Sequence, residues 1–229
     1  MGDDKLMENL EPNGKDHPDL DSGAEHAAPV RESRRTDVLA KAILDVVASI
    51  PATKEVRGAS PADRARAIQT AAALKAAAVS GTLALPPGPW GIAVVIPDLV
   101  AVWRIQAKMV ADIAGAYGQT AHLSQEHMVY CLFRHAAAQI VRDLVARVGE
   151  RVVFRKATLR ALQHVARRLG IKVTQHMIAK SAARWLPVVG SIGVAGYAYY
   201  DTTQVAVTAA ELFANDLVRD DSLPRAPEG

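Results

Sequence analysis

The sequence has little cysteine and few aromatic residues. Cys131 is the one cysteine among 229 residues, so no disulfide can form within the chain and a reducing compartment is expected. Aromatic residues make up 5% of the chain, whereas half of it is hydrophobic. This balance, together with abundant alanine, favours a core of closely packed helices. The length is sufficient for one domain with a substantial core.

Signals for export, lipid attachment and β-structure are also lacking. The first residues are acidic and contain no apolar run of the kind that a secretory signal needs. Leu6 stands where a myristoylation motif requires Ser or Thr. No run of alternating apolar and polar residues with turn signals predicts a strand. We therefore expect an all-α protein in the cytoplasm.

Charge is distributed unevenly along the chain. Residues 1–36 hold nine acids and five bases, whereas residues 37–219 hold 12 acids and 21 bases. Most of the basic excess lies in residues 134–184, with 12 bases against Asp143 and Glu150. An acidic tail beside a basic body suggests self-shielding or a regulated basic surface.

The chain divides into two tails and one domain. Residues 1–36 and 219–229 are polar and are expected to be disordered, because they cannot bury enough apolar area to offset chain entropy. Residues 37–218 form a single all-helical domain. Apolar periodicity and capping residues predict helices at about 38–50, 62–81, 98–118, 125–149, 153–169, 174–185 and 197–217.

Two apolar, glycine-rich stretches stand out in this domain. Residues 76–97 contain no charge and are interrupted by Pro86-Pro87-Gly88-Pro89, which no straight helix can carry. Residues 186–201 (LPVVGSIGVAGYAYYD) are similar. We interpret both as helical hairpins or turns, either related as an internal pseudo-repeat or alike by chance. Each is a buried core hairpin, a re-entrant membrane element or, for residues 76–97, a span of the membrane.

A basic belt follows the first stretch, with arginines and lysines among Val, Leu and Ala between residues 142 and 184. Such helices beside an apolar turn fit an anionic membrane surface. A merely solvated face is the alternative, and nucleic acid is disfavoured because no recognition motif is present. The residues expected to contact a membrane or partner are Pro86, Pro87, Gly88, Trp90, Leu186, Val188, Arg151, Arg155, Lys156, Arg160, Arg167 and Arg168.

Two further sets are candidates for chemistry. His127, Cys131 and His135 are spaced four residues apart and project from one side of a helix, as metal ligands or a cysteine–histidine pair would. Asp98 and Asp201 lie in apolar surroundings and would face each other if the two stretches were related by pseudo-symmetry. The alternatives are an ordinary helix side for the first set, and helix capping with arginine pairing for the second.

Three segments together resemble the EcsC family of bacterial proteins. They are KAAAVSGTLALPPGPWGIAVVIPDLVAVWRIQAKMVADIAGAYG, EHMVYCLFRHAAAQ and LPVVGSIGVAGYAYYDTTQVAVTAAELF, and the resemblance covers about residues 71–213. The family is named for a protein encoded beside an ATP-driven membrane transporter. The resemblance implies an all-helical fold in a membrane-linked setting and assigns no catalytic residue.

Together these patterns predict a non-enzymatic protein without a cofactor. It would associate with the cytoplasmic face of the inner membrane, or with a membrane complex linked to a transporter, through the apolar turns and the basic belt. One alternative is a metal-binding protein or hydrolase using Asp98 and Asp201 or His127, Cys131 and His135. Another is a soluble homo-oligomeric scaffold.

Overall fold

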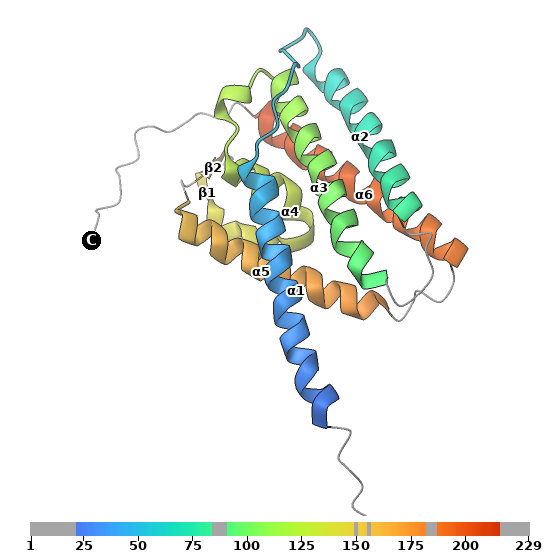
Figure 1. Ribbon diagram of the computed structural model, residues 1–229. Coiled ribbons are helices and arrows are strands. Elements are labelled where there is room, and N and C mark those ends of the chain that lie inside the picture. Colours follow the sequence, from blue (N-terminus) through green and yellow to red (C-terminus); the bar gives the residue numbers. More distant parts are fainter. Residues whose placement is uncertain (1–21, 84–90, 149–150, 155–156, 182–186, 216–229) are drawn as a thin grey trace, which may run out of the picture.

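The structure is a computed structural model that describes residues 22–83, 91–148, 151–154, 157–181 and 187–215. It is all-α, as expected, with one small antiparallel hairpin (Figure 1). The elements are α1 (Ser22–Ala48), α2 (Pro61–Leu83), α3 (Gly91–Ala116), η1 (Thr120–His122), α4 (Gln125–Val141), η2 (Arg142–Leu144), β1 (Val145–Val148), β2 (Arg151–Phe154), α5 (Leu159–Ser181) and α6 (Pro187–Ala214).

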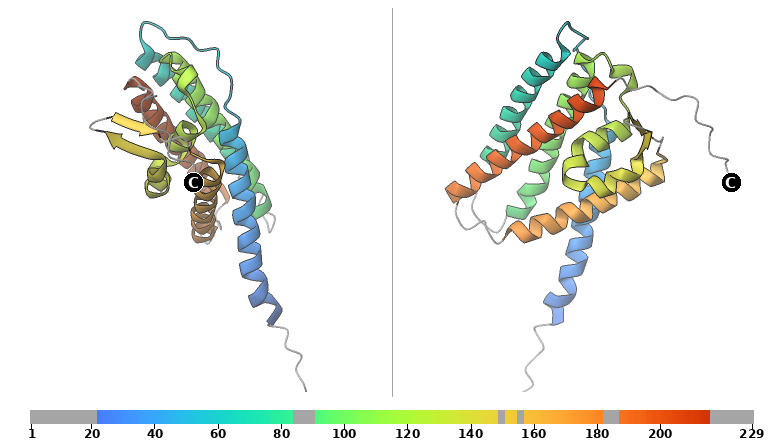
Figure 2. Two further views of the ribbon diagram at one scale, coloured as in Figure 1. Left: turned by 90° about the vertical axis from the view of Figure 1, so that its left-hand side faces the viewer. Right: turned by 180° about the vertical axis from the view of Figure 1, so that it is seen from behind.

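The helices form two groups, which meet through α4 and through direct packing of α1 on α3. In the first group, α2 packs against α3 and α6, and α3 packs against α6. In the second, α5 crosses α1, as both views in Figure 2 show. Helix α4 contacts α1, α3, α5 and α6 and so lies between the two groups. The upstream half of α1 extends beyond the other helices (Figure 1).

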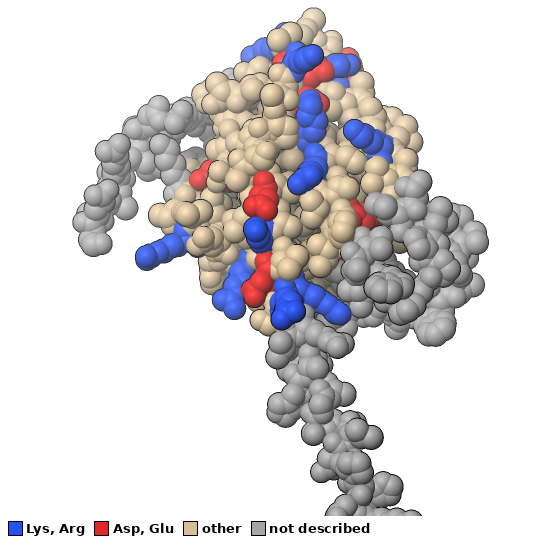
Figure 3. Space-filling model, viewed as in Figure 1, with Lys and Arg blue, Asp and Glu red and all other residues tan. Residues whose placement is uncertain are grey.

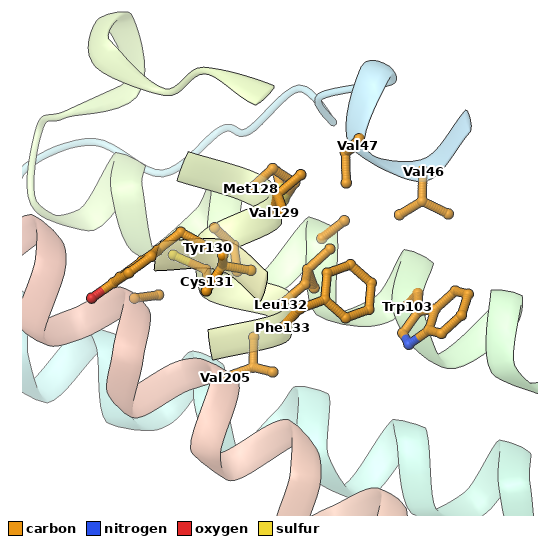
Figure 4. Packing of buried hydrophobic residues seen from close by; sticks show 14 of the residues in the cluster. Val46, Val47, Trp103, Met128, Val129, Tyr130, Cys131, Leu132, Phe133 and Val205 are labelled. Carbon is orange, nitrogen blue, oxygen red and sulfur yellow. The ribbon is translucent and has the colours of Figure 1, made fainter. Parts of the chain in front are cut away.

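Helix α4 is buried on all sides over one stretch, which makes it the centre of the core. Every residue from His127 to Phe133 is buried, whereas a surface helix buries a single stripe. Phe133 meets the ring of Trp103 of α3 edge to face, with centroids 5.5 Å apart. Figure 4 shows Phe133 and Trp103 side by side, with Val46 and Val47 of α1 above them and Val205 of α6 below. Residues from distant parts of the chain therefore share one core.

The connector between α1 and α2 is held against the second half of α3. Thr53 Oγ1 donates to Asp112 Oδ1 at 2.6 Å, and Glu55 accepts two hydrogen bonds from Arg64 at 2.8 and 2.5 Å. A Cβ on Gly115 would lie 2.7 Å from the carbonyl oxygen of Glu55. Glycine is therefore needed at residue 115 for the connector to approach the helix.

Two helices begin earlier than the sequence predicted. Helix α1 starts at Ser22, so helix occupies part of the segment for which we expected disorder. Helix α3 starts at Gly91 and carries Pro97 inside it, so Asp98 does not cap this helix as the sequence suggested. Pro97 itself is exposed, and a proline inside a helix leaves the carbonyl four residues earlier without its amide donor.

The region from 142 to 185 differs most from expectation. We predicted one helix to residue 149 and two more split at Gly170, and no strands. Instead α4 ends at Val141, β1 pairs with β2 in the register Val145 to Phe154, and α5 is continuous through Gly170. A Cβ on Gly170 would lie 2.9 Å from the carbonyl oxygen of Thr36 in α1. This glycine thus permits a helix crossing and does not end a helix.

The two glycine-rich stretches stand in different surroundings. Helices α2 and α3 pack along each other as an antiparallel hairpin. The second stretch is helical from Pro187, a residue favoured at a first helical position. Helix α6 packs against α2, while α5 packs mainly against α1 and α4. A second hairpin of α5 with α6 is therefore not formed by the residues that the structure describes.

Candidate functional site

The exposed side of α5 carries charge of one sign. The helix contains five bases and no acid. Four of the bases are exposed, and we call these residues the basic face: Arg160, Arg167, Arg168 and Lys172. At 100° per residue they fall on one side of the helix. Helix α1, which crosses α5, exposes bases and acids together. Where these two helices cross, the excess of bases over acids therefore comes from α5.

Apolar and neutral side chains lie within the basic face. Ile171 is 41% exposed and lies between the charged positions, next to His164 on the helical projection. Leu159, at the start of α5, is 68% exposed. An exposed apolar residue surrounded by bases is typical of helices that lie in the interface of an anionic membrane.

The opposite side of α5 fixes the orientation of this face. Leu162, Val165 and Leu169 are buried in the core, and Gly170 lies against α1. Glu126 of α4 accepts a hydrogen bond at 2.8 Å from the amide of Ala157, just before α5 begins. The helix therefore cannot roll without losing core contacts. Figure 3 shows lysine and arginine side chains at the lower end of the described surface, where α1 crosses α5, together with acidic side chains, and further bases along the middle and at the upper end.

The hydrogen bond to Glu126 also explains its ionisation. Burial alone would raise the pKa of this carboxyl group. Hydrogen bonds from the Ser124 side chain and from the Ala157 amide outweigh burial and lower the pKa below its ordinary value. A carboxylate is therefore available at neutral pH to hold the segment that leads into α5.

Several residues predicted to contact a membrane lie outside the described parts of the chain. This applies to Pro86, Pro87, Gly88, Trp90, Leu186, Arg155 and Lys156. Arg151 belongs to β2 and Val188 to α6, and the side chains of both fall outside the described part of the structure. No helix within the described ranges has the length and apolarity needed to cross a membrane.

A partly buried polar junction joins α3, α4 and α6. His135 Nε2 donates to Asp201 Oδ1 at 2.6 Å, and Gln106 Nε2 donates to Asp201 Oδ2 at 2.7 Å. Gln106 also donates to Thr202 Oγ1 at 3.2 Å. Gln106 is completely buried, whereas the side chains of His135 and Asp201 are 19% and 16% exposed. One carboxylate thus connects two neighbouring helices to α6.

The carboxylate also determines how the Gln106 amide is oriented. Turning the amide over would place its oxygen against Asp201, where two acceptors would repel each other. In the orientation seen, Gln106 Oε1 is the buried side-chain nitrogen or oxygen atom that lacks a partner within the described structure. The site therefore contains one buried acceptor that is not satisfied by the protein.

The structure does not bring His127, Cys131 and His135 together as ligands. His127 Nδ1 belongs to a capping box with Ser124, at 2.7 Å from its hydroxyl oxygen. Burial lowers the pKa of His127 to about 4. Cys131 is fully buried, and burial raises the pKa of its thiol, so a nucleophilic thiolate is strongly disfavoured. His135 pairs with Asp201 instead. No group of three or more His, Cys, Asp or Glu suited to a metal occurs among the residues that the structure describes.

Asp98 and Asp201 do not form the facing pair that pseudo-symmetry suggested. Asp98 Oδ1 accepts a hydrogen bond from Ser80 of α2 at 3.1 Å. Asp201 is bonded to Gln106, which lies about 12 Å further along α3 from Asp98 at the usual helical rise. The two acids therefore lie at different levels of the helix bundle and make separate contacts.

The pairing of His135 with Asp201 was not foreseen from the sequence, which placed them in two separate candidate sets. The role of Thr202 was also missed. The residues come from helices that are far apart in the chain, and no local spacing links them. An unusually buried glutamine on an apolar helix was the one available signal, because a buried amide needs partners.

Comparisons with family models, with curated proteins and with solved structures produced no match.

Proposed function

We propose that this protein is a non-enzymatic peripheral protein that binds anionic membrane surfaces through the basic face of α5. The observation that carries the proposal is an exposed helix side with four bases and no acid, with Ile171 in its midst. Helix α5 is held by core contacts, so the charges are presented together and little ordering is needed on binding.

The identity of the membrane surface is proposed from the sequence alone. We propose that the surface is the cytoplasmic leaflet of the inner membrane, or a membrane complex linked to a transporter, as the resemblance to the EcsC family implies. Anionic lipid gives that leaflet a negative potential. The apolar turns would add insertion energy beside the charges, and this part of the proposal concerns residues 84–90 and 182–186, outside the described structure.

The expected strength can be estimated from the exposed charges. Each base close to an anionic surface contributes about 1 kcal/mol. Removing three of them should therefore weaken vesicle binding about 100-fold. Electrostatic attraction of this kind falls with salt, because the Debye length shortens from about 8 Å at physiological ionic strength to about 3 Å at 1 M.

The test is vesicle flotation with a charge-matched control. The face variant replaces Arg160, Arg167 and Lys172 with glutamine. The control variant replaces the exposed bases Lys54, Arg66 and Lys75, which lie outside α1 and α5. Both variants lose three positive charges. We expect the wild type and the control to float with vesicles containing phosphatidylserine or phosphatidylglycerol, and the face variant to remain in solution. Equal behaviour of the two variants, or no binding by the wild type, contradicts the proposal.

The polar junction favours a structural role over the alternative of a hydrolase or metal protein. Both carboxylate oxygens of Asp201 accept hydrogen bonds from other helices, one from His135 Nε2 and one from Gln106 Nε2. A group engaged in this way would have to release its partner before it could bind a substrate or a metal. We therefore propose that the junction sets the packing of α3, α4 and α6. The alternative of a homo-oligomeric scaffold is tested separately, by size-exclusion chromatography with light scattering, which measures the mass of the protein in solution.

A further inference from the structure

We propose that the acidic segment formed by residues 1–21 of this chain occupies the basic face of α5 and competes there with anionic lipid. The inference rests on the proposed function, because it concerns regulation of the same surface. It differs in naming a second occupant, which is part of the protein itself.

Charge complementarity is the first argument. Residues 1–21 contain seven acids against Lys5 and Lys15. Helix α5 contains five bases and no acid. The other helices with several exposed charges are mixed: α2 exposes Asp63 beside Arg66, and α1 also carries both signs. Within the described structure, α5 is therefore the helix best suited to an acidic segment.

The connection between the two segments is the second argument. The acidic segment ends where α1 begins, at Ser22, and α1 crosses α5 at Thr36 and Gly170. The distance along α1 from Ser22 to Thr36 is about 21 Å at the helical rise. An extended segment of this length spans up to about 70 Å. Residues 1–21 can therefore return along α1 and reach the whole of α5.

Being part of the same chain gives the acidic segment an advantage over free anions. A tethered segment acts at an effective concentration in the millimolar range. If it covers the basic face about nine-tenths of the time, the apparent affinity for a vesicle falls about tenfold. Membrane binding would then require a surface with enough anionic lipid to displace the segment.

The first test compares two neutralised forms of the full chain. The segment variant carries D3N, D4N, E8Q and E11Q. The control variant carries D216N, D220N, D221N and E228Q. Each form loses four negative charges, so general repulsion from the vesicle changes equally. We expect the segment variant to bind phosphatidylserine vesicles about tenfold more tightly than the wild type, and the control to change much less.

The second test detects the contact without lipid. A carbodiimide joins a carboxylate to a lysine amine only when the two groups are in contact. In monomeric wild-type protein, carboxylates of residues 1–21 should link to Lys172 of α5 more than to the exposed Lys54 or Lys75, and 0.5 M salt should abolish the preference. Equal yields at the three lysines, or equal vesicle affinity of the segment variant and the wild type, overturn the inference. If no form binds anionic vesicles, the proposed function fails, and the crosslinks alone then decide whether the segment lies on the basic face.

Discussion

Replacing Gly170 with alanine tests the corrected structure of α5 directly. If this glycine instead ended a helix in the left-handed conformation, alanine would cost about 1 kcal/mol through strain of its own backbone, with no effect of a neighbouring helix. In the structure Gly170 lies within α5, where α1 crosses it. The added Cβ would lie 2.9 Å from the carbonyl oxygen of Thr36 and 3.3 Å from the amide nitrogen of Ala40. Both contacts are with backbone, which cannot turn aside as a long side chain can.

Two opposing effects determine the expected magnitude. Alanine in a helix interior is favoured over glycine by about 0.5–1 kcal/mol. Forcing an extra methyl group into a closely packed contact typically costs about 1–3 kcal/mol. The contact with Thr36 requires the two helices to separate by several tenths of an ångström. We therefore expect G170A to lower the free energy of unfolding by about 1–2 kcal/mol.

The same substitution in α6 provides a matched control. A Cβ on Gly196 would meet no atom within 4 Å. Only the higher helix propensity of alanine then acts, so G196A should raise the free energy of unfolding by about 0.5–1 kcal/mol. Urea unfolding followed by circular dichroism measures both variants. If G170A is as stable as the wild type or more so, the close crossing of α1 over α5 is wrong.

Three further predictions concern the polar junction and the buried residues of α4. Replacing Asp201 with alanine leaves the buried Gln106 amide with only its bond to Thr202 Oγ1 and removes the acceptor of the partly exposed His135 ring. We expect a cost of about 1–3 kcal/mol in urea unfolding, whereas removing the exposed carboxylate of Glu211 should cost less than about 1 kcal/mol; equal losses would argue against the polar junction. Because the pKa of His127 is lowered from its ordinary 6.5 to about 4 in the folded state, the unfolded state binds the proton first as the pH falls. Stability should therefore be complete above pH 6.5 and decline by about 3 kcal/mol toward pH 4, and a glutamine variant at this position should show a flatter dependence if the reasoning is correct. The buried Cys131 thiol should not react with a thiol reagent until denaturant unfolds the protein, and rapid labelling of the native protein would contradict its burial.

Helix content was predictable because it depends on local pattern. Pro61 with Asp63 in the first turn predicted the start of α2, and the structure begins the helix there. Glycine was a less reliable predictor of where a helix ends. Gly118 does end α3 in the left-handed conformation, whereas Gly170 lies within a helix because a neighbouring helix approaches it. The same residue type serves both purposes, and only the neighbour distinguishes them.

The residues of the polar junction could be recognised as unusual from the sequence, but their contact with one another could not be predicted. His135 and Asp201 were selected separately, one for its helical spacing and one for its apolar surroundings. Their contact depends on α6 lying beside both α3 and α4. The interpretation of His127 and Cys131 as one helix side failed for a related reason, since α4 is covered on all sides and has no free face there.

The sequence by itself determined the helical class, the separation of acidic and basic segments and the absence of a disulfide. These properties follow from composition and from short-range periodicity, which act within a few residues along the chain. The tertiary structure decided which glycines allow helices to cross, which polar groups meet, and which of the bases in residues 142–184 share an exposed face. These outcomes depend on packing between segments far apart in the chain, where the partner of a side chain is set by the path of other helices and by the need to satisfy buried polar groups.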